Sequence, residues 1–275
     1  MVRTWWILLA IAIGLAIPVR LTGQSLKPQT VAEFENYVQQ AECRMAARKA
    51  FLVADADRAL LDQVARSATV QTVLGNGPNP HKISGAMIYD WIGTVFIPGA
   101  TVDRTVRMLQ DYDHRAQYFS EVIASSKLLC RSAEDRFGFT MRLKEPAVID
   151  SDNDVVWEKV DAQRWRCRSY STKVTEIGKQ HGYILRLYSY WRFAETGKGV
   201  IAEGQTITLS GEFGSFMRTL GSLAGINPEK SLKKSLGSMR ETLTRPGMEF
   251  ALPPAGLPSC GEPVRVTGCA LQSSR

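Results

Sequence analysis

The sequence has few of the residue patterns that mark metal centres, nucleic-acid interfaces or hydrolytic sites. It contains five cysteines without C-x-x-C spacing and three widely separated histidines, which excludes the common structural zinc sites. Its net charge of +7 is spread along the chain without a Lys/Arg block, so no nucleic-acid partner is expected. No G-x-S-x-G nucleophile motif is present. We therefore expect no metal, no other cofactor and no catalytic residues of these classes.

The chain also lacks an apolar run long enough to span a bilayer. Residues 5–19 are apolar, follow Arg3 and end before Arg20, whereas a spanning helix needs about 20 residues. A basic start followed by a short apolar stretch and small residues is typical of a secretory signal peptide. The sequence predicts a leader over residues 1–24 and export to the periplasm or out of the cell. An uncleaved N-terminal anchor is the alternative.

The number and spacing of the cysteines predict one local disulfide in an exported chain. Cys260 and Cys269 flank a stretch that contains glycine and proline, and we expect them to form a short loop. Cys43, Cys130 and Cys167 are interpreted as small buried apolar residues.

Apolar spacing divides the rest of the chain into three parts. Residues 29–68 show helical periodicity, and the Gly/Pro-rich turn at 75–80 ends an N-terminal helical segment that we place at 25–80. The main domain occupies 81–246, and a Pro/Gly-rich tail occupies 247–275. Composition is that of a globular protein, with 44% hydrophobic and 22% charged residues.

The main domain is predicted to be α+β. Alternating apolar residues predict a strand over 86–97, a helix capped by either Thr101 or Asp103, and then strands over 123–130, 137–143, 155–160, 164–174, 183–193 and 200–209. The run 151–154 is interpreted as a turn. The last two strands are expected to form a hairpin in which Ala194 pairs with Val200 and Trp191 lies opposite Glu203. Pro228 begins a long helix whose apolar stripe contains Leu232, Leu236, Met239 and Leu243.

This order of elements resembles the START-like, or helix-grip, superfamily, which includes lipid-transfer domains, pollen allergens, polyketide cyclases and coenzyme Q-binding proteins. The residues that carry the resemblance are Phe-Ile-Pro-Gly-Ala-Thr at 96–101, Leu-Gln-Asp-Tyr at 109–112, Tyr-Ser-Tyr-Trp-Arg-Phe at 188–193, the strand with Glu203, and the helix over 228–243. The chain also resembles an uncharacterised group of exported bacterial proteins with an extra N-terminal helical segment. The resemblance implies a curved antiparallel sheet of about seven strands wrapped around the C-terminal helix, with a cavity for an apolar ligand between them.

The candidate ligand-binding residues are those that the predicted strand register and helix stripe turn toward this cavity. They are Tyr89, Trp91, Trp191, Glu203, Gln205, Leu232, Leu236 and Met239. A buried carboxylate must be paired, hydrogen-bonded or protonated, so Glu203 is either a polar handle for the ligand, an acid or base, or a structural carboxylate bonded to its neighbours.

Three functions fit these expectations. The leading one is an exported protein that holds a hydrophobic small molecule or lipid and makes at most transient contact with a membrane surface. An enzyme of the cyclase or dehydratase type would use the same cavity but needs an acid–base pair. An interaction module would fill the cavity with its own side chains. The sequence does not specify the ligand or the oligomeric state.

Overall fold

A computed structural model of the chain describes residues 26–72, 79–133, 135–145, 147–178, 182–211 and 228–264. Within these ranges the strands are β1 (Thr69–Thr72), β2 (His81–Ile83), β3 (Ala86–Pro98), β4 (Ile123–Ser132), β5 (Arg136–Leu143), β6 (Ile149–Lys159), β7 (Arg164–Glu176), β8 (Arg186–Thr196) and β9 (Gly199–Gly211). The helices are α1 (Pro28–Ala47), α2 (Arg58–Val64), α3 (Val102–Gln110), α4 (Arg115–Tyr118) and α6 (Pro228–Thr244), with single 3-10 turns η1 (Ala54–Ala56) and η2 (Tyr112–His114). None of these helices is long and apolar enough to cross a membrane.

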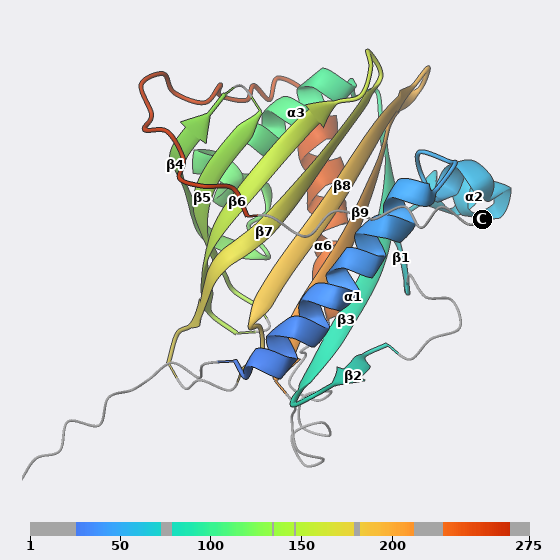
Figure 1. Ribbon diagram of the computed structural model, residues 1–275. Coiled ribbons are helices and arrows are strands. Elements are labelled where there is room, and N and C mark those ends of the chain that lie inside the picture. The colour runs from blue at the N-terminus through green and yellow to red at the C-terminus, as the bar shows by residue number, and fades with distance from the viewer. Residues whose placement is uncertain are drawn as a thin grey trace, which may run out of the picture.

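The strands of the described residues form one antiparallel nine-stranded sheet that curves around α6 (Figure 1). Its order is β1-β3-β9-β8-β7-β6-β5-β4, and β2 also pairs with β3. This confirms the predicted α+β helix-grip fold, with β1 and β2 as additional strands. β1 lies within the segment that the sequence assigns to the N-terminal helices and pairs with β3.

The inner face of the sheet packs on α3, α4 and α6, of which the sequence predicts α3 and α6. The hydroxyl of Thr101 accepts a hydrogen bond from the Arg104 amide, so Thr101 caps α3 as expected. Pro228 begins α6, and Leu232, Leu236, Met239 and Leu243 are buried in the core against α3, α4 and the sheet.

The outer face carries α1, which crosses β8, β9 and β3 on the side of the sheet opposite α6 (Figure 1). Phe34, Val38 and Ala41 of α1 are buried against apolar side chains of β3, β8 and β9. The Tyr37 hydroxyl donates to Asp90 at 2.9 Å, and Glu42 accepts hydrogen bonds from the hydroxyls of Tyr170 and Tyr190. The helix therefore covers the sheet with an apolar stripe flanked by buried hydrogen bonds.

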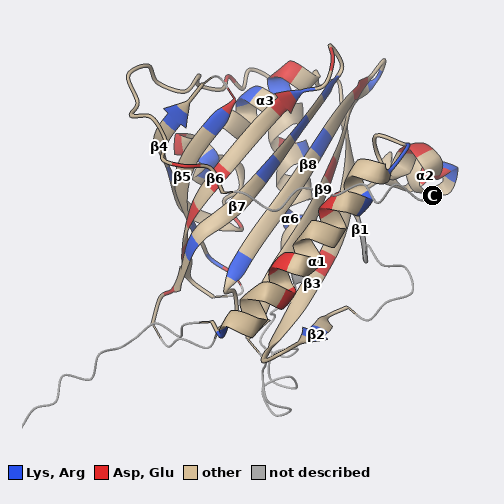
Figure 2. Cartoon of the chain, viewed as in Figure 1, with Lys and Arg blue, Asp and Glu red and all other residues tan. Residues whose placement is uncertain are grey.

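Beyond α1, the strands β5 to β8 carry many Lys and Arg residues (Figure 2). Arg164, Arg166 and Arg168 all lie there in the exposed class. Arg166 pairs with Glu158 at 2.7 Å, and Arg164 pairs with Asp161 at 2.6 Å. Exposed pairs of this kind contribute about 0–1 kcal/mol each, so this surface is a solvated face of the sheet.

The predicted register of the β8–β9 hairpin is wrong by one residue. Thr196 pairs with Gly199 across a two-residue turn, so Ala194 faces Ile201 and Trp191 faces Gly204. Two-residue turns are favoured because their twist matches that of the strands. A shift of one residue moves every side chain of a strand to the opposite face. Glu203 and Gln205 consequently lie on the outer face, under α1, rather than beside Trp191.

Two glycines allow Trp191 and α6 to pack closely on the inner face of the sheet. Gly93 and Gly204 are direct partners on β3 and β9. A Cβ atom on Gly204 would lie 2.6 Å from the Trp191 ring, and one on Gly93 would lie 2.5 Å from the Leu236 side chain. The indole and α6 can approach the sheet closely only because these positions have no side chain.

The predicted disulfide between Cys260 and Cys269 is also wrong. Cys260 is bonded to Cys130 of β4, with their Cα atoms 5.1 Å apart. The tail returns along β4, where the Arg131 amide donates to the Pro258 carbonyl, and so brings Cys260 beside Cys130. Cys43 is disulfide-bonded as well, whereas Cys167 is free and buried as expected. Cys269 and the predicted leader lie outside the described residues.

The residues at 151–154, expected to form a turn, lie within β6. Polar side chains are accommodated there because they find partners both on the neighbouring β5 and within β6 itself. Asp154 pairs with Arg136 at 2.9 Å, and the Asn153 amide donates to the Ser151 hydroxyl at 3.0 Å.

The tyrosines of the outer layer predict a loss of stability at alkaline pH. Burial raises the pKa of Tyr37, Tyr170, Tyr188 and Tyr190 above the ordinary value. An unfolded tyrosine ionises near pH 10, so above that pH the unfolded chain releases protons that the folded chain keeps. The free energy of unfolding should then fall by up to about 1.4 kcal/mol per pH unit for each tyrosine. Urea unfolding between pH 8 and 11 measures this.

Tyr190→Phe separates this effect from the titration of lysines. The variant removes the hydrogen bond to Glu42 and should be less stable at pH 8. Its stability should nevertheless fall less steeply than that of the wild type above pH 10. An unchanged slope would contradict the assignment.

Candidate functional site

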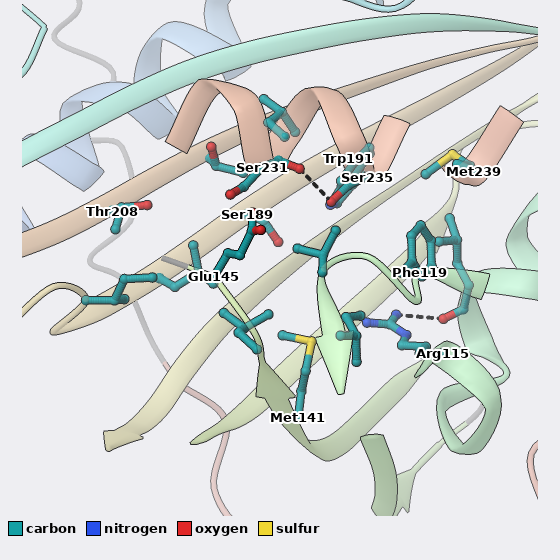
Figure 3. Close-up of a pocket in the computed structure, with 18 of the residues that line it drawn as sticks. Arg115, Phe119, Met141, Glu145, Ser189, Trp191, Thr208, Ser231, Ser235 and Met239 are labelled. Carbon is teal, nitrogen blue, oxygen red and sulfur yellow. Dashed lines mark hydrogen bonds between the residues drawn. The ribbon is translucent and has the colours of Figure 1, made fainter. Parts of the chain in front are cut away.

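A cavity of about 220 Å³ lies between the inner face of the sheet and α6 (Figure 3). It is larger than the ~150 Å³ cavities that hold benzene and somewhat smaller than typical drug-sized pockets of about 300–1,000 Å³. Apolar and aromatic side chains form most of its wall, and they are Tyr89, Leu109, Phe119, Val122, Ile123, Met141, Leu143, Trp157, Cys167, Tyr183, Ile184, Leu187, Trp191, Leu232 and Met239.

The register of the sheet gives the cavity two ends. Trp157, Cys167 and Trp191 are successive partners across β6, β7 and β8 and form the floor of one end, which we call the inner end. The other end is lined by half-buried residues that precede β8 or begin α6, including Ile184 and Ser231. A ligand would therefore lie lengthwise along β8 and β9.

Polar groups in the wall are mostly hydroxyls. Ser189, Thr206, Thr208 and Ser210 come from β8 and β9, and Ser231 and Ser235 come from α6. The Ser235 hydroxyl donates to the Ser231 carbonyl at 3.0 Å, so its hydrogen is used within the helix (Figure 3). Such groups can orient a ligand without supplying charge.

Two charged side chains complete the described wall. Glu145 accepts two hydrogen bonds of 3.0 Å from Lys234. Arg115 begins α4 and lies beside Phe119 and Met141 at the inner end (Figure 3). The Cys167 thiol is present as well, and burial raises its pKa to about 12, so it stays protonated at neutral pH. In the described ranges no group of His, Cys, Asp and Glu is arranged to hold a metal ion.

Of the eight candidate residues, four line this cavity: Tyr89, Trp191, Leu232 and Met239. Trp91 and Leu236 are on the same inner face but pack into the core beside the cavity. Glu203 and Gln205 do not contribute, because the one-residue difference in register turns them outward.

The environment of Glu203 identifies it as a structural carboxylate. It is 3% exposed, and its Oε1 accepts a 2.6 Å hydrogen bond from Arg48 Nη2. Its Oε2 accepts a 2.6 Å bond from the Val53 amide. Burial raises the pKa of this carboxyl, and the Arg48 charge opposes that rise. Glu203 thus fixes the segment that joins α1 to α2, on the side of the sheet away from the cavity.

Gln205 belongs to the same outer layer. Its side-chain amide donates to Asp90 Oδ1 at 2.8 Å, while Asp90 Oδ2 accepts from Tyr37 of α1. Burial raises the pKa of Asp90, and these two hydrogen bonds oppose the rise. The pair therefore helps to hold α1 on the sheet.

The chain resembles known proteins in structure but matches none of them at the level of sequence families. No protein-family model and no curated protein matches the chain. A STAR-related lipid transfer protein from Xanthomonas axonopodis is 17% identical, with a TM-score of 0.44 over 60% of this chain and 97% of its own. Human StAR-related lipid transfer protein 5 is 6% identical, with a TM-score of 0.42 over 77% and 95%. The Zhui aromatase/cyclase from Streptomyces sp. R1128 is 10% identical, with a TM-score of 0.44 over 56% and 92%.

The topology itself decides the class of fold. One long strand, a short helical connection, a run of antiparallel strands and a C-terminal helix held by the curved sheet form the helix-grip arrangement. The chain has a helix-grip fold. To this arrangement it adds α1 on the outer face and a disulfide-bonded tail along β4. Because a fold of this kind does not by itself determine a function, the function must be argued from the cavity.

Arg115 is the main cavity residue that sequence reasoning missed. Nothing in the sequence separates it from the other basic residues, because its position depends on how the α3–α4 connection folds back over the sheet. The hydroxyls of Thr206, Thr208 and Ser210 lie on a strand that was predicted, β9, but only the correct register turns them toward the cavity.

Proposed function

We propose that the protein binds an apolar small molecule or one apolar chain of a lipid in the cavity between sheet and α6, as a carrier or sensor. The observation that supports this is the wall itself, in which apolar side chains from six strands, from α3 and α6 and from the connecting segments surround about 220 Å³. Burial of an apolar ligand there would contribute roughly 25 cal/mol per Å² of apolar surface removed from water.

The titratable groups of the wall favour binding over catalysis. A cyclase or dehydratase needs an acid and a base that can exchange protons with the substrate. Glu145 is the one carboxylate among the described lining residues, and it is paired with Lys234. The raised pKa of Cys167 removes it as a nucleophile at neutral pH.

We also propose that the protein is exported. The disulfide between Cys130 and Cys260 supports this, since such bonds persist in oxidising compartments. A leader over residues 1–24 would direct export, and mass spectrometry of the protein from its own host would identify the mature N-terminus. An intact Met1 in soluble cytoplasmic material would contradict the proposal.

A cavity-filling substitution tests the binding site. Ser235→Phe places a ring into the cavity from α6, where the serine is half-buried. We expect the affinity for the neutral fluorophore N-phenyl-1-naphthylamine to fall at least tenfold, because the ring occupies the volume the probe needs. Fluorescence titration of the full chain gives the dissociation constants.

Lys233→Phe is the matched control, since it adds the same ring to an exposed position of the same helix. Its affinity should stay within about twofold of the wild type. Absence of probe binding to the wild type, or equal binding to all three proteins, would contradict the proposed site.

A further inference from the structure

The inner end of the cavity holds a half-buried cation without a carboxylate partner. Among the described residues Arg115 is the one Lys or Arg side chain that lines the cavity, and it takes part in no ion pair of that part of the chain. Its Nη2 donates to the Leu109 carbonyl at 2.7 Å, and its Nε is buried without an acceptor. A buried donor without a partner costs free energy, and the guanidinium that lines the cavity has further N–H donors for a ligand that supplies an acceptor.

The surroundings of Arg115 hold the guanidinium in place without neutralising it. Its centre lies 4.4 Å from the Tyr112 ring and 4.6 Å from the Phe139 ring. The Leu109 carbonyl is at the C-terminal end of α3, where the helix dipole also favours a cation. Asp111, the neighbouring carboxylate, already accepts hydrogen bonds from Tyr118, His114 and the Ala251 amide.

We propose that Arg115 binds the carboxylate of an apolar monocarboxylic acid, whose hydrocarbon part extends along β8 and β9 toward the other end of the cavity. This inference rests on the proposed function and specifies the class of ligand. A guanidinium has five N–H donors and binds carboxylates through two parallel hydrogen bonds. One cation balances one negative charge, whereas a phosphate monoester carries nearly two. The apolar wall beyond Arg115 provides the complementary surface for the chain of the acid.

Displacement of N-phenyl-1-naphthylamine by matched amphiphiles tests this. At pH 8, decanoate should displace the probe from the wild type at a concentration at least tenfold lower than 1-decanol, because hydrogen bonds to a charged group are worth more than those to a hydroxyl. Decyl phosphate should displace it less effectively than decanoate. Equal potency of decanoate and decanol, or greater potency of decyl phosphate, would overturn the assignment.

Arg115→Met keeps an unbranched but shorter side chain and removes its charge. In this variant decanoate and decanol should displace the probe at similar concentrations, so the preference for decanoate is lost. Arg166→Met, on the outer face, is the matched control and should keep the preference. An Arg115→Met variant that still prefers decanoate would overturn the assignment.

The result distinguishes this inference from the proposed function. If the neutral probe and decanol bind but decanoate is not preferred, the role of Arg115 fails and the apolar site stands. If neither the probe nor any amphiphile binds, both fail. The wild-type comparison needs no variant, so the test holds even if Arg115→Met does not fold.

Discussion

Replacement of Glu203 by leucine is expected to lower the free energy of unfolding by about 2–4 kcal/mol without changing the affinity for a neutral apolar probe. The substitution leaves the Arg48 guanidinium, 21% exposed, and the Val53 amide without their acceptor. Removing one partner of a buried ion pair typically costs about 3–5 kcal/mol, and partial exposure of Arg48 reduces that cost. Urea unfolding and probe titration measure the two effects.

Two further variants separate charge from hydrogen bonding. Glu203→Gln keeps an acceptor for the Val53 amide and should cost about 1–2 kcal/mol. The double variant Arg48→Met/Glu203→Leu removes both charges and should recover part of the lost stability. A Glu203→Leu protein with full stability and weakened probe binding would place this carboxylate in the cavity and contradict the register described above.

Loss of the disulfide between Cys130 and Cys260 should have the largest effect on stability. The bond joins residues 130 positions apart, and closing a loop of roughly this length is expected to stabilise the folded state by about 2–5 kcal/mol. Cys130→Ser/Cys260→Ser should therefore unfold at a clearly lower urea concentration than the wild type. Circular dichroism under non-reducing conditions provides the measurement.

Reducing conditions supply the control for this prediction. In the presence of a reductant both proteins lose the disulfide of Cys43, and the wild type also loses the bond between Cys130 and Cys260, so the unfolding midpoints of the two reduced proteins should converge. A wild type that keeps its advantage when fully reduced would show that the serines perturb packing beside Gly138, whose position leaves no room for a Cβ atom next to Cys130.

The elements with strong apolar periodicity were predictable from the sequence. α6 combines Pro228 at its start with a stripe of buried leucines, and α3 begins at a threonine that caps it. β1 was missed because a four-residue strand carries little periodicity. The polar start of β6 was taken for a turn because its acidic residues are stabilised by Arg136 and Arg142 of the neighbouring strand, which the sequence does not show.

The cavity was predictable as a location but only partly as a set of residues. Both faces of β3 and β9 are buried, one by α6 and the other by α1, so the apolar pattern could not reveal which side of β9 faces inward. The two glycines Gly93 and Gly204, which pair with each other, were the available signal for the inward side of β9. The Trp191 indole lies over Gly204, and a residue with a side chain at that position would leave it no space. The position of Arg115 beside the cavity depends on how the connection between α3 and α4 folds, and no pattern in the sequence indicates it.

The tail that follows α6 also determines how this protein can associate with itself. An uncovered edge strand is a template onto which another chain can add, which is a common route to aggregation. Pro258 accepts a hydrogen bond from Arg131 of β4, and the Ser132 hydroxyl accepts one from the Cys260 amide, so part of that edge is occupied by the chain itself. Leu129 on the same strand is largely exposed. Proteolysis between α6 and the tail would leave the tail attached to β4 through the disulfide of Cys260. The edge of β4 would therefore stay covered in an oxidising medium. Once that disulfide is reduced, the edge would become available for pairing with another chain.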